Sequence, residues 1–111
     1  MNTVEHTRTA NVVGLGLIGG SIALALRERG WDVRGSDLDD VVSRRAEHEG
    51  IISEIGLDLE ADITIVAVPV TASVGVVRQM LETTSGVVTD VGSVKAPICE
   101  SIHDKRFIGG H

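Results

Sequence analysis

The residues of this sequence best suited to binding chemistry begin with three closely spaced glycines. Gly14, Gly16 and Gly19 form a G-x-G-x-x-G pattern directly after an apolar run. In such a loop Gly14 permits a tight turn, Gly16 lets the backbone approach a phosphate, and Gly19 lets a helix pack closely on a strand. The N–H groups of the first helical turn, around Leu17 and Ile18, then face the anion. The pattern predicts a dinucleotide site, and a glycine-rich turn without a ligand is the alternative.

An acid at the end of the next predicted strand supports the dinucleotide interpretation. Asp37 lies eighteen residues after Gly19, where a carboxylate accepts hydrogen bonds from the hydroxyls of the adenosine ribose. A carboxylate repels a 2′-phosphate, and Leu38 offers no positive charge to hold one. We therefore predict NAD rather than NADP as the cofactor. Arg44 and Arg45, on the next predicted helix, either reach back toward Asp37 or stay solvated on an exposed face.

The elements that must position these residues follow from the spacing of apolar side chains. The patterns predict strands at about 9–13, 32–36, 53–55, 63–68 and 87–89 and from 106, and helices at about 17–29, 39–49, 70–81 and 97–103. Thr71 is the expected cap of the third helix. Strands that alternate with helices predict an α/β fold, a Rossmann-type doubly wound parallel sheet with three layers and the strand order 3-2-1-4-5-6.

Composition narrows the possible functions of the chain. Its 111 residues suit one domain, in which we expect residues 1–8 to be a disordered lead-in. A net charge of −6 and only two aromatic residues, Trp31 and Phe107, argue against nucleic-acid binding. The single cysteine, Cys99, and four scattered histidines give no metal-ligand spacing, so we predict no metal site. With no apolar run near the eighteen or so residues of a membrane span, we predict a cytoplasmic protein without membrane contact.

Further polar residues are expected at the same edge of the sheet as the glycine loop. Ligands of doubly wound sheets lie beyond the carboxyl ends of the strands. Val68 ends a predicted strand at that edge, and Pro69, Asp90 and Ser93 follow predicted strands there. All four are predicted to contact the cofactor, and His111 falls at the same edge. From residue type alone, Ser93 is more often a loop or helix-capping serine than a catalytic one, and His111 is more often a solvated chain end. Asp90 either orients a neighbouring group or caps its loop.

Four motifs occur in a distinctive order along the chain. They start at Gly14, Ala67, Thr89 and Phe107, and read Gly-Leu-Gly-Leu-Ile-Gly-Gly-Ser, Ala-Val-Pro-Val, Thr-Asp-Val-Gly-Ser-Val-Lys and Phe-Ile-Gly-Gly-His. In this order and at these separations they closely resemble the N-terminal domain of prephenate dehydrogenases, the tyrosine-biosynthesis family that includes arogenate dehydrogenases. The first motif is shared by many dehydrogenases, whereas the last two together are far more specific. The resemblance covers essentially the whole chain.

The resemblance implies oxidative decarboxylation of prephenate to 4-hydroxyphenylpyruvate with reduction of NAD. It implies that His111 hydrogen-bonds the ring hydroxyl of the substrate and takes its proton as hydride leaves the same carbon. It also implies that Ser93 orients that hydroxyl and the histidine. A neutral imidazole near pH 7 is a suitable base. Because aromatisation drives the loss of carbon dioxide, the protein mainly positions the hydride donor and acceptor.

Length is the main departure from the family pattern. Family members continue past the histidine, finish the nucleotide domain and add a helical C-terminal domain that provides the dimer interface and most contacts to the substrate carboxylates. We therefore expect residues 9–111 to be a dinucleotide-binding domain that is incomplete at its C-terminus, inactive alone, and dimeric only with that second domain. Prephenate and arogenate are not separated by the sequence. A stand-alone NAD-binding or NAD-sensing module and a β-hydroxyacid type of dehydrogenase remain as alternatives.

Overall fold

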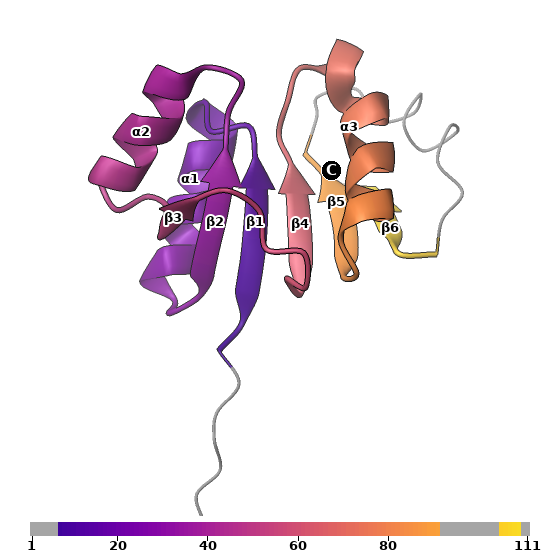
Figure 1. Ribbon diagram of the computed structural model, residues 1–111, viewed down its shortest axis with the longest axis horizontal. Helices are drawn as coiled ribbons and strands as arrows, with labels where there is room; N and C mark the ends of the chain where they lie inside the picture. Colours follow the sequence, from indigo (N-terminus) through magenta and orange to yellow (C-terminus); the bar gives the residue numbers. More distant parts are fainter. Residues whose placement is uncertain (1–6, 92–104, 110–111) are drawn as a thin grey trace, which may run out of the picture.

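Six parallel strands form a single sheet in the computed structural model, which describes residues 7–91 and 105–109 (Figure 1). In chain order the elements are β1 (Thr9–Val13), α1 (Leu17–Glu28), β2 (Asp32–Ser36), α2 (Asp40–His48), β3 (Glu54–Ile55), β4 (Ile63–Val66), α3 (Val70–Thr83), β5 (Val87–Asp90) and β6 (Phe107–Gly109). The strand order is β3-β2-β1-β4-β5-β6 and all five pairings are parallel. The predicted fold class and strand order are confirmed. Residues 1–6 of the predicted lead-in and the predicted helix at 97–103 lie outside the described residues.

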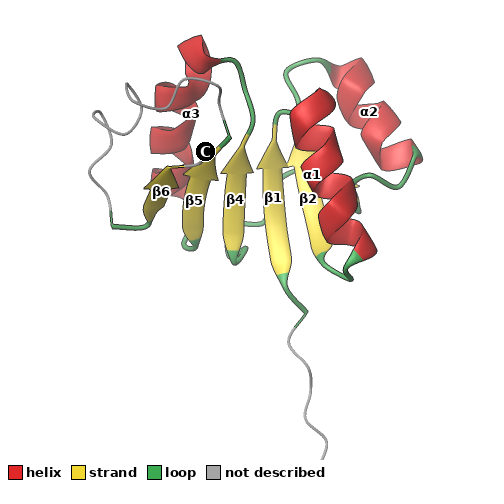
Figure 2. Cartoon of the chain, turned by 180° about the vertical axis from the view of Figure 1, so that it is seen from behind, coloured by secondary structure: helices red, strands yellow, loops and turns green. Residues whose placement is uncertain are grey.

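The helices cover both faces of the sheet. α1 and α2 lie on one face and α3 lies on the other, as the two opposite views show (Figure 1 and Figure 2). This division follows from the strand order, because right-handed crossovers that run in opposite directions from β1 and β4 place their helices on opposite faces. The point where the order reverses, between β1 and β4, is where ligands of such sheets bind.

An apolar cluster lies on each face of the described part of the sheet. The cluster under α1 and α2 consists of Ala10, Val12, Leu15, Ala23, Val33, Ala46, Ile52 and Ile65. The cluster under α3 consists of Val66, Val77, Met80, Leu81 and Val88. Adjacent residues of one strand, such as Ile65 and Val66, belong to opposite clusters. The nearly continuous apolar runs of these strands therefore reflect burial on both faces, as is typical of parallel sheets.

One amide side chain is fully buried in the centre of the sheet. Asn11, on β1, donates from Nδ2 to the Asp58 carbonyl at 2.8 Å and to Thr64 Oγ1 at 3.0 Å. Its Oδ1 accepts the Asp58 N–H at 2.8 Å. These bonds offset the cost of removing the amide from water. They also fasten the segment between β3 and β4 across the sheet, which fixes the neighbouring residues Gly56 and Leu57.

Two strand ends differ from the prediction. β4 ends at Val66 instead of Val68: the Ala67 N–H still donates to the Val13 carbonyl at 2.7 Å, but the chain then turns into α3. β5 extends to Asp90, which the sequence placed in the following loop. Asp90 is in register with Val66 on one side and with Gly109 on the other, so pairing with two neighbours continues the strand.

The expected cap of α3 was also wrong. Pro69 is the residue at the N-cap position and no side-chain cap is formed there, so Thr71 already lies inside the first turn. Proline suits the start of a helix because its fixed φ matches the helix and it has no N–H to satisfy. The Ser73 hydroxyl instead bonds back to the carbonyls of Val68, at 3.3 Å, and Pro69, at 3.2 Å.

An arginine directly before β6 stabilises the end of α3. The last turn of α3, all of which is described, contains no basic residue to complement the helix dipole. Arg106 supplies the missing charge: its Nη1 donates to the carbonyls of Thr84, at 2.7 Å, and Gly86, at 3.0 Å, and its Nη2 donates to the Leu81 carbonyl. The Leu81 and Thr84 carbonyls are among those that the end of α3 leaves without helical partners. The guanidinium thus ties β6 to α3 and to the turn before β5.

We expect Arg106→Met to lower the free energy of unfolding by about 2 kcal/mol, because it removes charge-assisted bonds to partly buried carbonyls. Urea unfolding followed by circular dichroism measures this change. Lys105→Met is the matched control, since it removes a neighbouring exposed positive charge. Equal stabilities of the two variants would contradict the role assigned to Arg106.

Candidate nucleotide-binding site

Two glycines of the loop between β1 and α1 are required by the fold itself. Gly14 has φ +99°, and a Cβ there would lie 2.3 Å from the Ala67 carbonyl oxygen. A Cβ on Gly19 would lie 1.8 Å from the Gly14 carbonyl oxygen and 3.1 Å from Ala67 Cβ. Both distances to oxygen are far below any real contact. The first turn of α1 and its loop therefore rest directly on the residue that follows β4.

Gly16 is different, because packing in the described structure does not require it to be a glycine. Its φ of −71° is open to any residue, and a Cβ there would meet no atom of the described residues within 4 Å. Gly16 is also the N-cap of α1, where no described side chain forms a cap bond and the first turn contains no acidic residue. The positive end of the α1 dipole is thus left for an external anion, and the open side of Gly16 lets that anion approach the backbone.

Substitution by alanine should separate the two kinds of glycine. We expect Gly19→Ala to lower the free energy of unfolding by at least about 3 kcal/mol, because the methyl group must displace backbone. Gly16→Ala should cost less than about 1 kcal/mol, mainly because alanine is a poorer N-cap than glycine. Chemical denaturation of both variants checks this difference. A large loss of stability in Gly16→Ala would show that the loop is packed more tightly there than the structure indicates.

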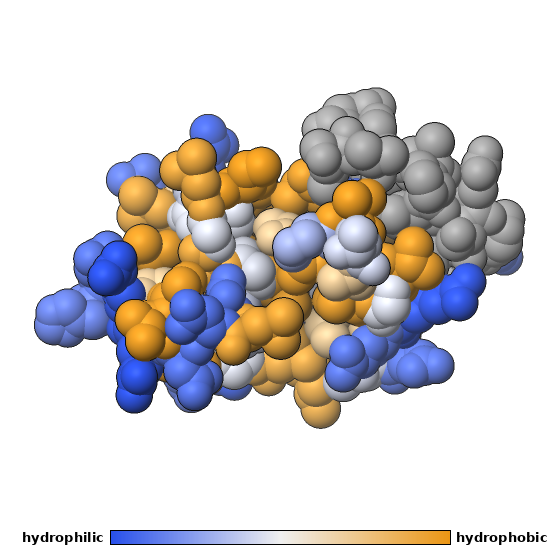
Figure 3. All heavy atoms as spheres, turned by 90° about the horizontal axis from the view of Figure 1, so that it is seen from above, coloured by the Kyte–Doolittle hydropathy of each residue, from blue (hydrophilic) through white to orange (hydrophobic). Residues whose placement is uncertain are grey.

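A cavity of about 580 Å³ runs from the glycine loop to the end of β2. Its lining residues are Val13, Gly14, Gly16, Ser36, Asp37, Leu38, Gly56, Leu57, Ala67, Val68, Pro69, Ala72, Val76, Gln79 and Met80. A second cavity of about 380 Å³, on the other side of Gly16, is lined by Gly16, Leu17, Ile18, Gly19, Ala67, Val68, Pro69, Val70 and Val91. Figure 3 looks onto this end of the molecule and shows abundant apolar side chains there. Mostly apolar cavities of this size are typical small-molecule sites.

The two cavities bring together most of the residues predicted to bind a cofactor. Gly14, Gly16 and Asp37 line the larger cavity, and Leu17, Ile18 and Gly19 line the smaller one. Val68 and Pro69 line both. The predicted contacts are therefore arranged around the α1 N-terminus, at the carboxyl edge of the sheet.

Asp37 lines the larger cavity at the end of β2, next to the glycine loop. Its carboxylate Oδ2 accepts the Leu15 N–H at 2.7 Å and its Oδ1 accepts the Asp39 N–H at 2.9 Å. A carboxylate has about four acceptor sites, so these two bonds leave capacity for ligand hydroxyls. Leu38 is 97% exposed, and Arg44 and Arg45 are exposed on α2, in agreement with the solvated alternative.

Of the remaining predicted residues, Asp90 alone lies in the part of the chain that the structure describes. Asp90 is fully buried at the end of β5 and does not line either of them. Its burial suits an orienting role better than direct contact with a ligand. Ser93 and His111 lie outside the described residues, so their predicted roles stay predictions.

The α3 wall of the larger cavity was missed at the level of sequence. Ala72, Val76 and Gln79 line it from α3 at i, i+4 and i+7 spacing, and Leu57 closes it from the segment after β3. The helical spacing was readable, since it forms a second face beside the residues that cover the sheet. The packing of α3 over the sheet, which directs this face toward the cavity, was not readable.

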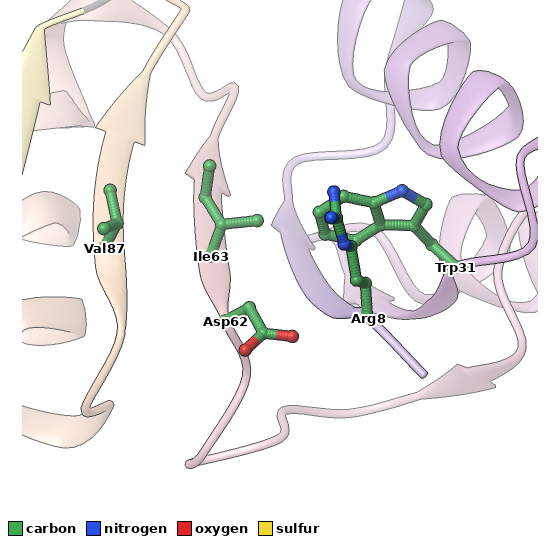
Figure 4. Close-up of a pocket in the computed structure, with 5 residues that line it drawn as sticks. All are labelled: Arg8, Trp31, Asp62, Ile63 and Val87. Carbon is green, nitrogen blue, oxygen red and sulfur yellow. The ribbon is translucent and has the colours of Figure 1, made fainter. Parts of the chain in front are cut away.

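A further hollow lies at the opposite, amino-terminal edge of the sheet (Figure 4). It has a volume of about 380 Å³ and is lined by Arg8, Trp31, Asp62, Ile63 and Val87. The Arg8 guanidinium carbon lies 5.9 Å from the Trp31 ring centroid, and Asp62 Oδ2 accepts the Thr9 N–H at 2.9 Å. Because these charged groups are already engaged within the protein, the carboxyl edge remains the stronger candidate.

Metal and membrane features are absent from the part of the chain that the structure describes. No three histidine, cysteine, aspartate or glutamate side chains gather there in a way that would hold a metal ion. No helix among residues 7–91 and 105–109 has both the length and the apolar character needed to cross a membrane.

Comparison with known proteins places this geometry in a family. The family model named "Prephenate dehydrogenase, nucleotide-binding domain" matches residues 22–111. The chain belongs to this family. A prephenate dehydrogenase from Lactococcus lactis subsp. cremoris is 36% identical over 115 residues, which cover 90% of this chain and 32% of that protein. The chain thus spans about a third of the length of this curated relative.

Solved structures of prephenate and arogenate dehydrogenases share the fold. The prephenate dehydrogenase of A. aeolicus, solved in complex with hydroxyphenyl propionate and NAD+, aligns with a TM-score of 0.82 at 30% identity over 98% of this chain and 43% of that one. The arogenate dehydrogenase of Synechocystis aligns with a TM-score of 0.77 at 33% identity over 84% of this chain and 36% of that one. These alignments agree with the family model, whose description is that of a nucleotide-binding domain.

Proposed function

We propose that this domain binds NAD and serves as the nucleotide-binding part of a prephenate dehydrogenase. The observation that carries the proposal is the open side of Gly16, at an uncapped helix N-terminus that borders both cavities. Here a glycine is needed for a ligand and not for packing. The backbone around Gly16, Leu17 and Ile18 would hold the pyrophosphate, and Asp37 would accept bonds from the adenosine ribose. Bound NAD would supply the acceptor for the substrate hydride.

We further propose that NAD is preferred over NADP. The Asp37 carboxylate would face a 2′-phosphate with a like charge, and the exposed Leu38 offers no compensating cation. Arg44 and Arg45, exposed on α2, do not line the larger cavity. A like charge at hydrogen-bonding distance in a partly buried site is strongly unfavourable.

Isothermal titration of the 111-residue chain tests both statements. NAD should bind at least tenfold more tightly than NADP, and Gly16→Ala should weaken NAD binding at least tenfold because its methyl group occupies the path of the phosphate. The circular dichroism spectrum and unfolding midpoint of Gly16→Ala should stay close to those of the parent chain. Unchanged NAD affinity in a folded Gly16→Ala variant would contradict the proposed pyrophosphate position.

For the chemistry, we propose oxidative decarboxylation of prephenate with His111 as the base and Ser93 as its orienting partner. The chain leaves β6 two residues before His111, and β6 lies parallel to β5 with Gly109 opposite Asp90. The described end of β6 thus lies at the carboxyl edge of the sheet, as the cavities do, which supports the proposed role of the nearby His111. The histidine would accept the proton of the substrate hydroxyl, and the serine would hold that hydroxyl in line. The likeness to an arogenate dehydrogenase at 33% identity makes arogenate the second candidate substrate.

The biological setting proposed for the domain follows the same family. We place it in tyrosine biosynthesis, in the cytoplasm, and in a homodimer only when it is joined to a second, helical domain. In support, the alignments cover 32% to 43% of prephenate dehydrogenases, which leaves most of each relative for other parts.

We expect the 111-residue chain alone to form no NADH from prephenate and NAD above the background rate, because most contacts to the substrate carboxylates are proposed to come from the second domain. Absorbance at the NADH band measures this directly. The NAD titration above serves as the control that the nucleotide site is formed. Turnover comparable to that of a complete relative would contradict the proposal.

A further inference from the structure

The Asp37 carboxylate is hydrogen-bonded to the glycine loop itself. Oδ2 accepts the N–H of Leu15, the residue between Gly14 and Gly16, at 2.7 Å. The preceding amide, that of Gly14, donates to the Ser36 carbonyl at 2.8 Å. Two consecutive amides of the loop are thus bonded to two consecutive residues at the end of β2. Leu15 is only 6% exposed, so water is a poor substitute partner for its amide.

Asp37 is in turn held from its other side by α2 and the turn before it. Its Oδ1 accepts the Asp39 N–H at 2.9 Å. Its backbone N–H donates to Ser43 Oγ at 2.9 Å, and the Ser43 hydroxyl donates to the Asp37 carbonyl at 3.3 Å. Ser43 lies in α2 and is only 4% exposed. The direction in which the carboxylate points is therefore set by the protein before any ligand contact.

We propose that Asp37 is a positioning residue for the glycine loop, and that Ser43 holds Asp37 in place for this role. The carboxylate fixes the Leu15 amide and thereby the course of the backbone into Gly16 and the start of α1. This role concerns the loop alone and adds to the ribose contact, which rests on the proposed NAD site.

The double use of one carboxylate has a consequence for cofactor choice. Removing Asp37 removes the repulsion of a 2′-phosphate, but it also frees the loop that would hold the pyrophosphate. Asp37→Ala should therefore lose NAD affinity without gaining NADP affinity. If the ratio of NAD affinity to NADP affinity falls in this variant, the cause is weaker binding of NAD.

Amide hydrogen exchange, followed residue by residue by NMR in the 111-residue chain, tests the loop role without any nucleotide. In Asp37→Ala the Leu15 amide should exchange at least about tenfold faster, since a hydrogen bond of ordinary strength is lost. The Ala67 amide, which donates to Val13, should keep its rate and serves as the internal reference. Asp40→Ala is the matched control, because it removes an exposed acid from the first turn of α2. Asp37→Asn, which keeps an acceptor oxygen, should retain most of the protection of Leu15.

An unchanged Leu15 rate in Asp37→Ala would overturn the proposal, as would equal acceleration of Leu15 and Ala67. If Asp37→Ala does not fold, Ser43→Ala provides the test instead. Alanine is well tolerated inside a helix, and the substitution removes both hydrogen bonds between Ser43 and the Asp37 backbone. We expect severalfold faster exchange of Leu15 in that variant, and an unchanged rate would reject the proposal.

Titration of the same variants with NAD and NADP separates this proposal from the proposed function. If the parent chain binds no NAD while the Leu15 rate depends on Asp37, the nucleotide site is wrong and the loop role stands. If NAD binds but the exchange rate of the Leu15 amide is the same with and without the Asp37 carboxylate, the nucleotide site stands and the loop role is wrong. A tenfold gain in NADP affinity in Asp37→Ala would contradict the shared use of the carboxylate.

Discussion

The contact between the glycine loop and the residue after β4 is the constraint on which the rest of this domain depends. A Cβ on Gly14 would collide with the Ala67 carbonyl, and a Cβ on Gly19 would collide with the Gly14 carbonyl oxygen and crowd Ala67 Cβ. This contact sets α1 directly over the point where the strand order reverses, between β1 and β4. With α1 placed there, its N-terminus opens onto the gap between the strand ends, and both cavities form around it. A single close approach of backbone to backbone thus determines where a ligand is able to bind.

Polar bonds then fix the parts of the site that close packing does not reach. The buried Asn11 side chain hydrogen-bonds to the backbone of Asp58 in the segment after β3. These bonds help to position the adjacent Leu57, which lines the larger cavity. Asp37 fastens the glycine loop from the end of β2, and Ser43 fastens Asp37 from α2. In each case a buried or partly buried side chain bonds to backbone of a different element. Such bonds give loops a defined course where regular secondary structure is lacking.

The architecture was readable from the sequence because each strand and helix has a local signature. Apolar runs, glycine turns and helical spacing gave the strand order and placed even the two-residue β3 within a residue of its true position. The predicted ends of β4 and β5 were wrong because pairing with neighbouring strands, and not residue type, determines where a strand ends. Ala67 and Val68 are apolar but leave the sheet, whereas the acid Asp90 stays in it because neighbours on both sides pair with it. Thr71 was a reasonable cap by residue type, yet Pro69 starts the helix two residues earlier.

The candidate site was predicted only in part, because contacts between distant segments of the chain do not show in local sequence patterns. The glycines and Asp37 were found from their spacing, but the bond from Asp37 to Leu15 depends on the exact course of the loop. Similarly, Gln79 lines the larger cavity because of how α3 packs, which helical spacing does not reveal. The catalytic assignments of Ser93 and His111 come from resemblance to the family and stay predictions.

The contrast among the three glycines bears on how such domains diverge. Gly14 and Gly19 are kept by the packing of the molecule, so a descendant that had ceased to bind nucleotides would still need them in order to fold. Packing does not require Gly16, so under the proposed function the ligand alone would keep it, and without the ligand it would be free to change. Two of the three glycines in the G-x-G-x-x-G pattern therefore indicate the fold and not the function. The middle glycine is the position where we expect domains that still bind nucleotides to keep glycine and domains that have lost binding to carry other residues.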